Sequence, residues 1–254
     1  MENENLHNIC NLNANDKELE AYKQLVKLRD YSPIPDSEVL ANEGLFLTRS
    51  SIGRMLFLHD LYKKTINTHG SIMEFGVRWG QNMAYFTSFR SMYEPYNLSR
   101  EVIGFDTFEG FPSVSKEDGT ANVVEVGSYT VGDNYEKYLG KLLDTHEALA
   151  PRANKKKYKL IKGDVMDTLP EYLKKHPETI ISLVYFDLDL YEPTKKSLEL
   201  LKPHLAKNSI IAFDQLCLGD FPGETIALKE VFDLNSIEIH RSEFSPQQSY
   251  IIFK

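Results

Sequence analysis

Short apolar runs alternate with helix-patterned stretches from residue 69 onward, and this alternation restricts the fold more than any other feature of the sequence. Each run ends in a glycine or an acidic residue, and the five runs are 71–76, 101–106, 158–163, 180–187 and 209–214. The helix-patterned stretches between them lie near 80–93, 134–148, 167–176 and 193–205. Such alternation predicts parallel strands joined by right-handed helical crossovers, as in an α/β fold.

Two more strand-like segments, near 236–241 and 248–253, follow at the end of the sequence. The turn between them, which contains Pro246, is too short for a helical crossover. We therefore expect one of the two strands to run antiparallel at the sheet edge. The predicted sheet has seven strands, most of them parallel.

The first part of the chain has a different pattern. Residues 1–20 are polar and predict a flexible N-terminal tail. Helical periodicity from Glu20 to Arg29 and from Ser51 to Thr65, broken by a proline-containing segment between them, predicts a helical cap over 21–68. The main domain is then expected at 69–254, with the long connection 107–157 as an insert that acts as a lid.

The charge balance excludes several functions. The chain has 29 basic and 37 acidic residues, a formal net charge of −8, so it lacks the basic surface of a nucleic-acid binder or a polybasic membrane anchor. No apolar run approaches membrane-spanning length, and the first residues have no signal-peptide pattern. Two cysteines, Cys10 and Cys217, are too few for a disulfide framework. We expect a cytoplasmic protein without nucleic-acid or membrane partners.

A glycine-containing turn follows the first predicted strand. The segment EFGVRWG, residues 74–80, opens the next helix, whose amino terminus favours negative charge. The turn lacks the G-x-G-x-x-G spacing of dinucleotide-binding proteins. The acid Glu74 near the strand end would repel a pyrophosphate but suits a ligand with a cationic amine or sulfonium, such as S-adenosylmethionine.

Acids also follow the second and third predicted strands. Asp106 could bind ribose hydroxyls or cap its own turn, and its position after the glycine-containing turn favours the ribose interpretation. Asp164 lies where an adenine amino group could meet it. We interpret Asp167 or Thr168 as the N-cap of the following helix, with Pro170 in its first turn.

Three more acids lie at the ends of the fourth and fifth predicted strands. Asp187 and Asp189 are a candidate metal ligand and general base, and Asp214 would join Asp187 across the sheet. The alternative is that they are loop acids at a helix start marked by Pro193 and Thr194. Farther along, Glu224 or Thr225 is expected to cap a helix, and Cys217 is expected to be a small structural residue.

These motifs, in this order, resemble those of class I S-adenosylmethionine-dependent methyltransferases. More narrowly, the chain is similar to the macrocin O-methyltransferase family over about residues 45–235. The segments that carry the resemblance are EFGVRWG, GFDTFEGFP, KGDVMDTLP and DLDLYEPT, followed by the strand that ends at Asp214. The resemblance implies a Rossmann-like, doubly wound sheet and O-methylation of a sugar hydroxyl on a glycoside, nucleotide sugar or polysaccharide precursor.

The resemblance also implies roles for individual residues. Asp189 is implied as the general base, and Asp187, Asp214 and Gln215 as ligands of a magnesium ion, Mg²⁺. The residues implied to bind the cofactor are Glu74, Phe75, Gly76, Arg78, Gly80, Asn82, Asp106, Thr107, Asp164, Val165 and Asp187. Gln215 departs from the family, which usually has a second Asp there, and its neutral amide oxygen would coordinate the ion more weakly than a carboxylate.

The partner implied is a small molecule that contains a sugar, and residues 107–133 together with the cap would shape its pocket. The sequence leaves open whether the protein forms a homodimer. Two other functions stay open as well: an oxidoreductase that binds a nucleotide or dinucleotide, against which the missing G-x-G-x-x-G spacing argues, and a catalytically inactive cofactor-binding homologue, which only Gln215 suggests.

Overall fold

The computed structural model describes residues 15–254, so residues 1–14 of the expected tail lie outside it. The chain divides after Ile52 into two compact units. The first unit contains α2 (Asp16–Asp30), α3 (Asp36–Val39) and the short helix η1 (Leu40–Phe46). Helix α2 begins four residues before Glu20, because Asn15 and Glu18 form a capping box in which each side chain accepts a hydrogen bond from the other residue's backbone N–H.

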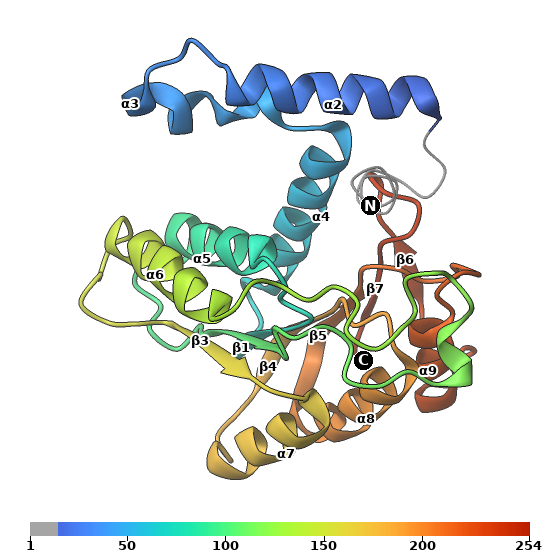
Figure 1. Cartoon of the computed structure of the whole chain (residues 1–254). Helices are drawn as coiled ribbons and strands as arrows, with labels where there is room; N and C mark the ends of the chain where they lie inside the picture. The colour runs from blue at the N-terminus through green and yellow to red at the C-terminus, as the bar shows by residue number, and fades with distance from the viewer. Residues whose placement is uncertain (1–14) are drawn as a thin grey trace. The chain divides into compact units, whose positions relative to one another are not determined.

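The second unit is built on one seven-stranded sheet (Figure 1) with the order β3-β2-β1-β4-β5-β7-β6. The strands are β1 (Ser71–Phe75), β2 (Val102–Asp106), β3 (Tyr158–Lys162), β4 (Ile181–Phe186), β5 (Leu205–Phe213), β6 (Ile239–Arg241) and β7 (Ser249–Ile252). Strands β1 to β5 pair in parallel, and β7 pairs antiparallel with β5 and with the edge strand β6. The predicted fold class is confirmed.

Helices cover both faces of this sheet. They are α4 (Arg49–Thr65), α5 (Gln81–Tyr93), α6 (Tyr135–Ala148), α7 (Val165–Lys175), α8 (Tyr191–Leu201) and α9 (Gly223–Val231), with the short helices η2 (Lys116–Asp118) and η3 (Lys202–His204). One core lies between the sheet and α4, α5 and α6, and the other between the sheet and α7, α8 and α9. Successive strand residues alternate between the two cores: Ile72 lies in the first and Met73 in the second.

Two helices begin earlier than the sequence predicts. Asp164, not Asp167 or Thr168, is the N-cap of α7, and its side chain accepts a hydrogen bond of 2.9 Å from the backbone N–H of Met166. Pro170 therefore lies inside α7 and not in its first turn. Helix α8 begins two residues before Pro193, which is tolerated there because the first N–H groups of a helix have no intrahelical partner.

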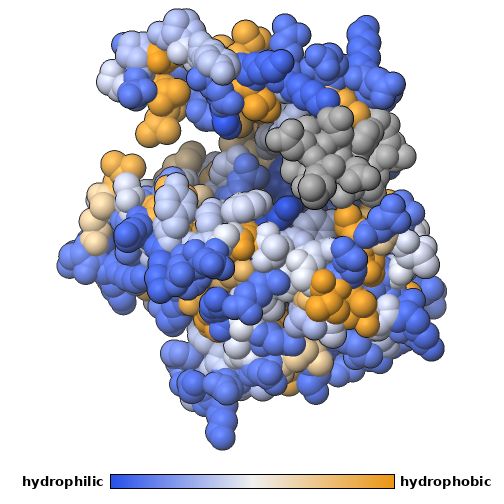
Figure 2. All heavy atoms as spheres, viewed as in Figure 1, coloured by the Kyte–Doolittle hydropathy of each residue, from blue (hydrophilic) through white to orange (hydrophobic). Residues whose placement is uncertain are grey.

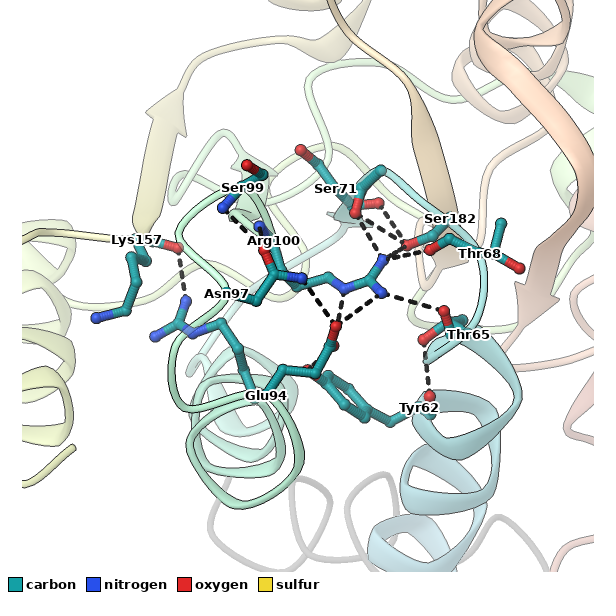
Figure 3. A network of polar contacts seen from close by, with 12 residues as sticks. Tyr62, Thr65, Thr68, Ser71, Glu94, Asn97, Ser99, Arg100, Lys157 and Ser182 are labelled. Atoms are coloured by element: carbon teal, nitrogen blue, oxygen red, sulfur yellow. Dashed lines mark hydrogen bonds and ion pairs between the residues drawn. The ribbon is translucent and has the colours of Figure 1, made fainter. Parts of the chain in front are cut away.

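A buried arginine ties together the ends of the strands opposite the acids (Figure 3). The Arg100 guanidinium donates to the backbone carbonyls of Thr68 and Gly70 at 2.9 and 2.7 Å, and to Ser182 Oγ at 2.6 Å. It also forms an ion pair of 2.9 Å with Glu94, which follows α5. Every such donor is expensive to leave unpaired when buried, so this network fixes the starts of β1 and β4.

The face of the molecule that is seen in Figure 2 is mostly polar. Figure 2 shows hydrophobic residues of the viewed face in small groups among hydrophilic ones. Within residues 15–254, no helix is both long enough and apolar enough to cross a membrane.

Candidate active site

Four acids lie on one face of the sheet at the carboxyl ends of its strands. Glu74 is on β1 and Asp106 ends β2, while Asp187 and Asp214 directly follow β4 and β5. Each lies an even number of residues after a strand residue of the core beneath α4, α5 and α6: Ile72, Val102, Tyr185 and Ala212. The two-residue period of a strand therefore turns the four carboxylates toward these helices.

The glycines of the turn between β1 and α5 are needed for packing within the protein. Gly76 and Gly80 both have positive φ, of 87° and 80°. A Cβ at Gly76 would overlap the backbone carbonyl oxygen of Asp187, and one at Gly80 would overlap the Leu139 side chain of α6. The sequence predicts that glycines in this turn let the backbone approach a ligand. At these two positions, they instead let the turn approach the end of β4 and helix α6. Phe75 lies in the core, stacked between other phenylalanines, and its carbonyl accepts the backbone N–H of Asp187 at 2.8 Å, so its side chain does not face a ligand.

Asp106 holds this turn in place. Its two oxygens accept the backbone N–H groups of Arg78 at 2.7 Å and of Phe108 at 2.5 Å. Burial raises the pKa of Asp106, and these hydrogen bonds oppose the shift. The Thr107 hydroxyl donates to the Gly110 carbonyl at 2.7 Å, so this side chain stabilises its own turn. A carboxylate with two N–H donors still has acceptor positions for hydroxyl groups.

Glu74 is a buried carboxyl group without sufficient partners. Only 1% of the residue is exposed, and Oε2 has no hydrogen-bond partner. Burial, followed by the charge of Asp187, raises its pKa well above the usual range, although a hydrogen bond with Asn82 opposes this. Asn82 is itself buried, and its Oδ1 has no partner. An unpaired buried oxygen is costly, so this position favours a cationic or hydrogen-bond-donating group.

The residues that follow β3 offer fewer groups to a cofactor than the sequence predicts. One oxygen of Asp164 is engaged as the N-cap of α7, and the side chain is partly exposed. Val165 is buried in the core beneath α7, α8 and α9. Asp164 can still face a ligand with its second oxygen, while the Val165 side chain contributes packing.

An arginine from α4 lies between Asp187 and Asp214. Arg54 Nη1 lies 3.1 Å from Asp187 Oδ2, and Nη2 lies 2.8 Å from the Asp214 carboxylate. Tyr185 Oη and Gln248 Nε2 also donate to Asp214 Oδ1, at 2.6 and 2.8 Å. Sequence reasoning missed Arg54, because a single arginine in an amphipathic stretch carries no local signal of a distant acidic partner.

In this arrangement the pKa values of Asp187 and Asp214 shift in opposite directions. Burial would raise the pKa of Asp214, but Arg54 and the donors Tyr185 and Gln248 hold it below its usual value. Burial raises the pKa of Asp187 well above its usual range, the charge of Asp214 adds to this, and Arg54 only partly offsets it. Asp214 is therefore the more stable anion of the pair.

Asp189 lies in the loop beyond β4 with a left-handed φ of 63°. Its Oδ1 accepts a hydrogen bond from the Gln215 amide nitrogen. Burial, followed by the charge of Asp214, raises its pKa to about 7, while Arg78, Arg54 and the Gln215 amide oppose the shift. A carboxyl group with this pKa can exchange a proton near neutral pH.

Glu224 supports the Asp189 loop and is not the helix cap that the sequence predicts. Its Oε1 accepts the backbone N–H groups of Leu188 at 3.0 Å and of Asp189 at 3.3 Å. Helix α9 instead begins after Pro222, without a side-chain cap. The residue is fully buried and Oε2 has no partner.

The segment 107–133 lies beside these groups. Backbone hydrogen bonds between Phe111 and both Gly127 and Ser128, of 2.9 and 3.0 Å, close it into a loop. Asp118 Oδ1 accepts the backbone N–H of Tyr191 at 2.6 Å, which attaches the loop to the start of α8. The Arg78 guanidinium lies 4.7 Å from the centre of the Tyr129 ring. Burial, followed by the charge of Asp189, raises the pKa of Tyr129, so this loop contributes to the surroundings of Asp189.

The expected magnesium ligands do not fit a divalent ion as they are arranged. Arg54 lies between Asp187 and Asp214, and the amide nitrogen of Gln215 is directed at Asp189. Within residues 15–254, no group of three or more His, Cys, Asp or Glu side chains could hold a metal ion.

Comparisons with known proteins place the chain beside O-methyltransferases. The family model described as Macrocin-O-methyltransferase (TylF) matches residues 47–223. The crystal structure of CalS11, calicheamicin methyltransferase, is 40% identical over 94% of this chain and 93% of its own, with a TM-score of 0.92. The apo structure of CalS11, described as a TDP-rhamnose 3'-O-methyltransferase of calicheamicin biosynthesis, is 38% identical over 94% and 95%, with a TM-score of 0.83.

A more distant likeness concerns the fold alone. The O-methyltransferase NovP is 19% identical over 80% of each chain, with a TM-score of 0.59. None of the curated proteins matches the chain.

Proposed function

Since the chain belongs to the macrocin O-methyltransferase family, we propose that it transfers the methyl group of S-adenosylmethionine to a hydroxyl of a sugar. The acceptor to test first is a nucleotide-linked deoxysugar, because the similar protein CalS11 is described as acting on TDP-rhamnose. Glycosides and polysaccharide precursors are the other members of this acceptor class.

The observation that carries the proposal is the unpaired buried oxygen of Glu74 beside the turn that Asp106 holds. A cofactor ammonium or sulfonium would satisfy Glu74, and the free acceptor positions of Asp106 suit ribose hydroxyls. The second oxygen of Asp164 is available to an adenine amino group. These residues fit S-adenosylmethionine, which when bound supplies an activated methyl group on a positively charged sulfur.

The base in this proposal is Asp189. As the acceptor oxygen forms its bond to the methyl carbon, the bond from that carbon to sulfur breaks, and the hydroxyl proton passes to the Asp189 carboxylate. Its pKa of about 7 suits this exchange, because a base is most effective when its pKa lies near the working pH. Glu224 and Gln215 position Asp189 through its backbone and side chain, and the 107–133 loop would exclude water.

The test is methyl transfer by the full chain. It is incubated with S-adenosylmethionine labelled in the methyl group and, separately, with a nucleotide-linked deoxysugar, the free sugar and a glycoside. We expect the label to appear on a sugar oxygen of one acceptor, located by NMR. Binding of S-adenosylmethionine without transfer to any of the acceptors would argue for the inactive homologue, and absence of cofactor binding would refute the proposal entirely.

A further inference from the structure

Two acids at the ends of neighbouring strands require a cation between them. Phe186 of β4 pairs with Phe213 of β5, so the residues that follow, Asp187 and Asp214, lie side by side. Two adjacent carboxylates in a mostly buried site repel each other unless a positive charge lies between them. Arg54 supplies that charge, with its two terminal nitrogens 3.1 and 2.8 Å from the two carboxylates.

The groups around Asp214 suit a guanidinium better than a metal ion. Mg²⁺ requires near-octahedral coordination by oxygen atoms. Asp214 Oδ1 instead accepts hydrogen bonds from Tyr185 and Gln248, and the carboxylate is paired with Arg54. Next to Asp214, Gln215 is a neutral amide whose nitrogen donates to Asp189. The groups that are hydrogen-bonded to the Asp214 carboxylate are therefore donors, whereas a metal ion needs acceptors.

Arg54 is held in this position by its helix. Leu58 and Leu61 lie four and seven residues after Arg54, hence on the same face of α4, and both are completely buried against the sheet. The Arg54 side chain is 28% exposed, and its charged end reaches the two acids. A planar guanidinium can also contact two carboxylates at once, which a lysine ammonium does less well.

We propose that Arg54 takes the place of a divalent cation between Asp187 and Asp214, so that the chain works without a bound metal ion. The inference rests on the proposed methyl transfer. Arg54 acts as a positioning residue: it fixes both carboxylates and reduces the negative charge that they place near Asp189. The neutral Gln215 amide beside Asp214 and the arginine bridge are two separate features with the same consequence.

The test measures metal binding directly, without an acceptor. The wild-type chain, stripped with a chelator, is titrated with Mn²⁺, and the free ion is followed by electron paramagnetic resonance. We expect no saturable site in the wild type. The double variant Arg54→Met, Gln215→Asp removes the guanidinium and restores the acid, so it should bind Mn²⁺ at least about tenfold more tightly than the wild type.

Two further variants complete the experiment. Lys63→Met removes an exposed positive charge from the same helix, and it should behave like the wild type. Arg54→Lys keeps a charge between the acids and should likewise bind no Mn²⁺, while methyl transfer falls because an ammonium contacts two carboxylates at once less well than a guanidinium does. If the double variant does not fold, the Mn²⁺ titration of the wild type alone still tests the proposal.

Two results would contradict the proposed role of Arg54. Saturable binding of Mn²⁺ to the wild type, or methyl transfer that is lost after chelation and restored by Mg²⁺, would overturn the proposal. Because the titration needs no acceptor, a failed methyl-transfer assay with unchanged Mn²⁺ behaviour would count against the proposed function and not against the role of Arg54.

Discussion

Removing the Glu224 carboxylate should weaken both the fold and the reaction, because this buried group holds the loop of the proposed base. Its Oε1 accepts two backbone N–H groups, those of Leu188 at 3.0 Å and Asp189 at 3.3 Å. In Glu224→Ala both donors lose their partner. A buried donor left unsatisfied costs about 1–3 kcal/mol. The 3.3 Å hydrogen bond of Asp189 is the weaker one, so its loss should cost only about 1 kcal/mol. Together the two losses should lower the free energy of unfolding by about 2–4 kcal/mol.

The matched control is Glu224→Gln. It keeps an oxygen where Oε1 lies and has nearly the same shape, so the free energy of unfolding should change by less than about 1 kcal/mol. Both variants are measured by denaturant unfolding, together with kcat for methyl transfer and cofactor affinity. In the alanine variant kcat should fall more than cofactor affinity, because Asp189 is then free to leave its left-handed conformation. Equal stability of the alanine variant and the wild type would refute this role of Glu224.

Two further predictions concern the cofactor turn. Glu74→Gln removes the charge proposed to meet the cofactor cation, so S-adenosylmethionine should bind at least about tenfold more weakly in calorimetry, the low end for a hydrogen bond to a charged group. The exposed control Glu178→Gln should leave binding unchanged, and equal affinities of the two variants would remove Glu74 from the cofactor site. Gly76→Ala combines a left-handed φ with overlap of the Asp187 carbonyl, so thermal unfolding should report a loss of more than about 2 kcal/mol. At Gly132, where a Cβ meets open space, alanine should stay within about 0.5 kcal/mol of the wild type, and a similar loss at both glycines would contradict the packing argument.

The sequence predicts the acid-lined end of the sheet because that feature depends on local pattern. Asp106, Asp187 and Asp214 each end a short apolar run, Glu74 lies two residues before the end of another, and parallel strands bring such ends to one edge. The two-residue period then sets the face on which the side chains lie. For the same reason, the strand positions and the resemblance to the family both follow from the sequence alone.

The contacts that modify these acids come from elsewhere in the chain and have no local signal. Arg54 lies 133 residues before Asp187, on a helix whose pattern shows only amphipathicity. Glu224 has the spacing of a helix cap, but tertiary contact with the Asp189 loop determines its role. The N-cap of α7 lies three residues before the predicted Asp167: Asp164, two residues after the end of β3, caps the helix, and the sequence could not distinguish the two positions.

The pH dependence of methyl transfer by the wild type and by Asp189→Asn tests the central claim most directly. A base must be deprotonated to act, and a pKa of about 7 means that Asp189 is ionised above neutral pH and protonated below it. For the wild type, kcat/KM should therefore fall about tenfold from about pH 8 to about pH 6. Asp189→Asn should bind the cofactor as the wild type does, transfer at least about a hundredfold more slowly, and lose this pH dependence. Near-wild-type transfer by Asp189→Asn, with the same pH profile, would contradict the account.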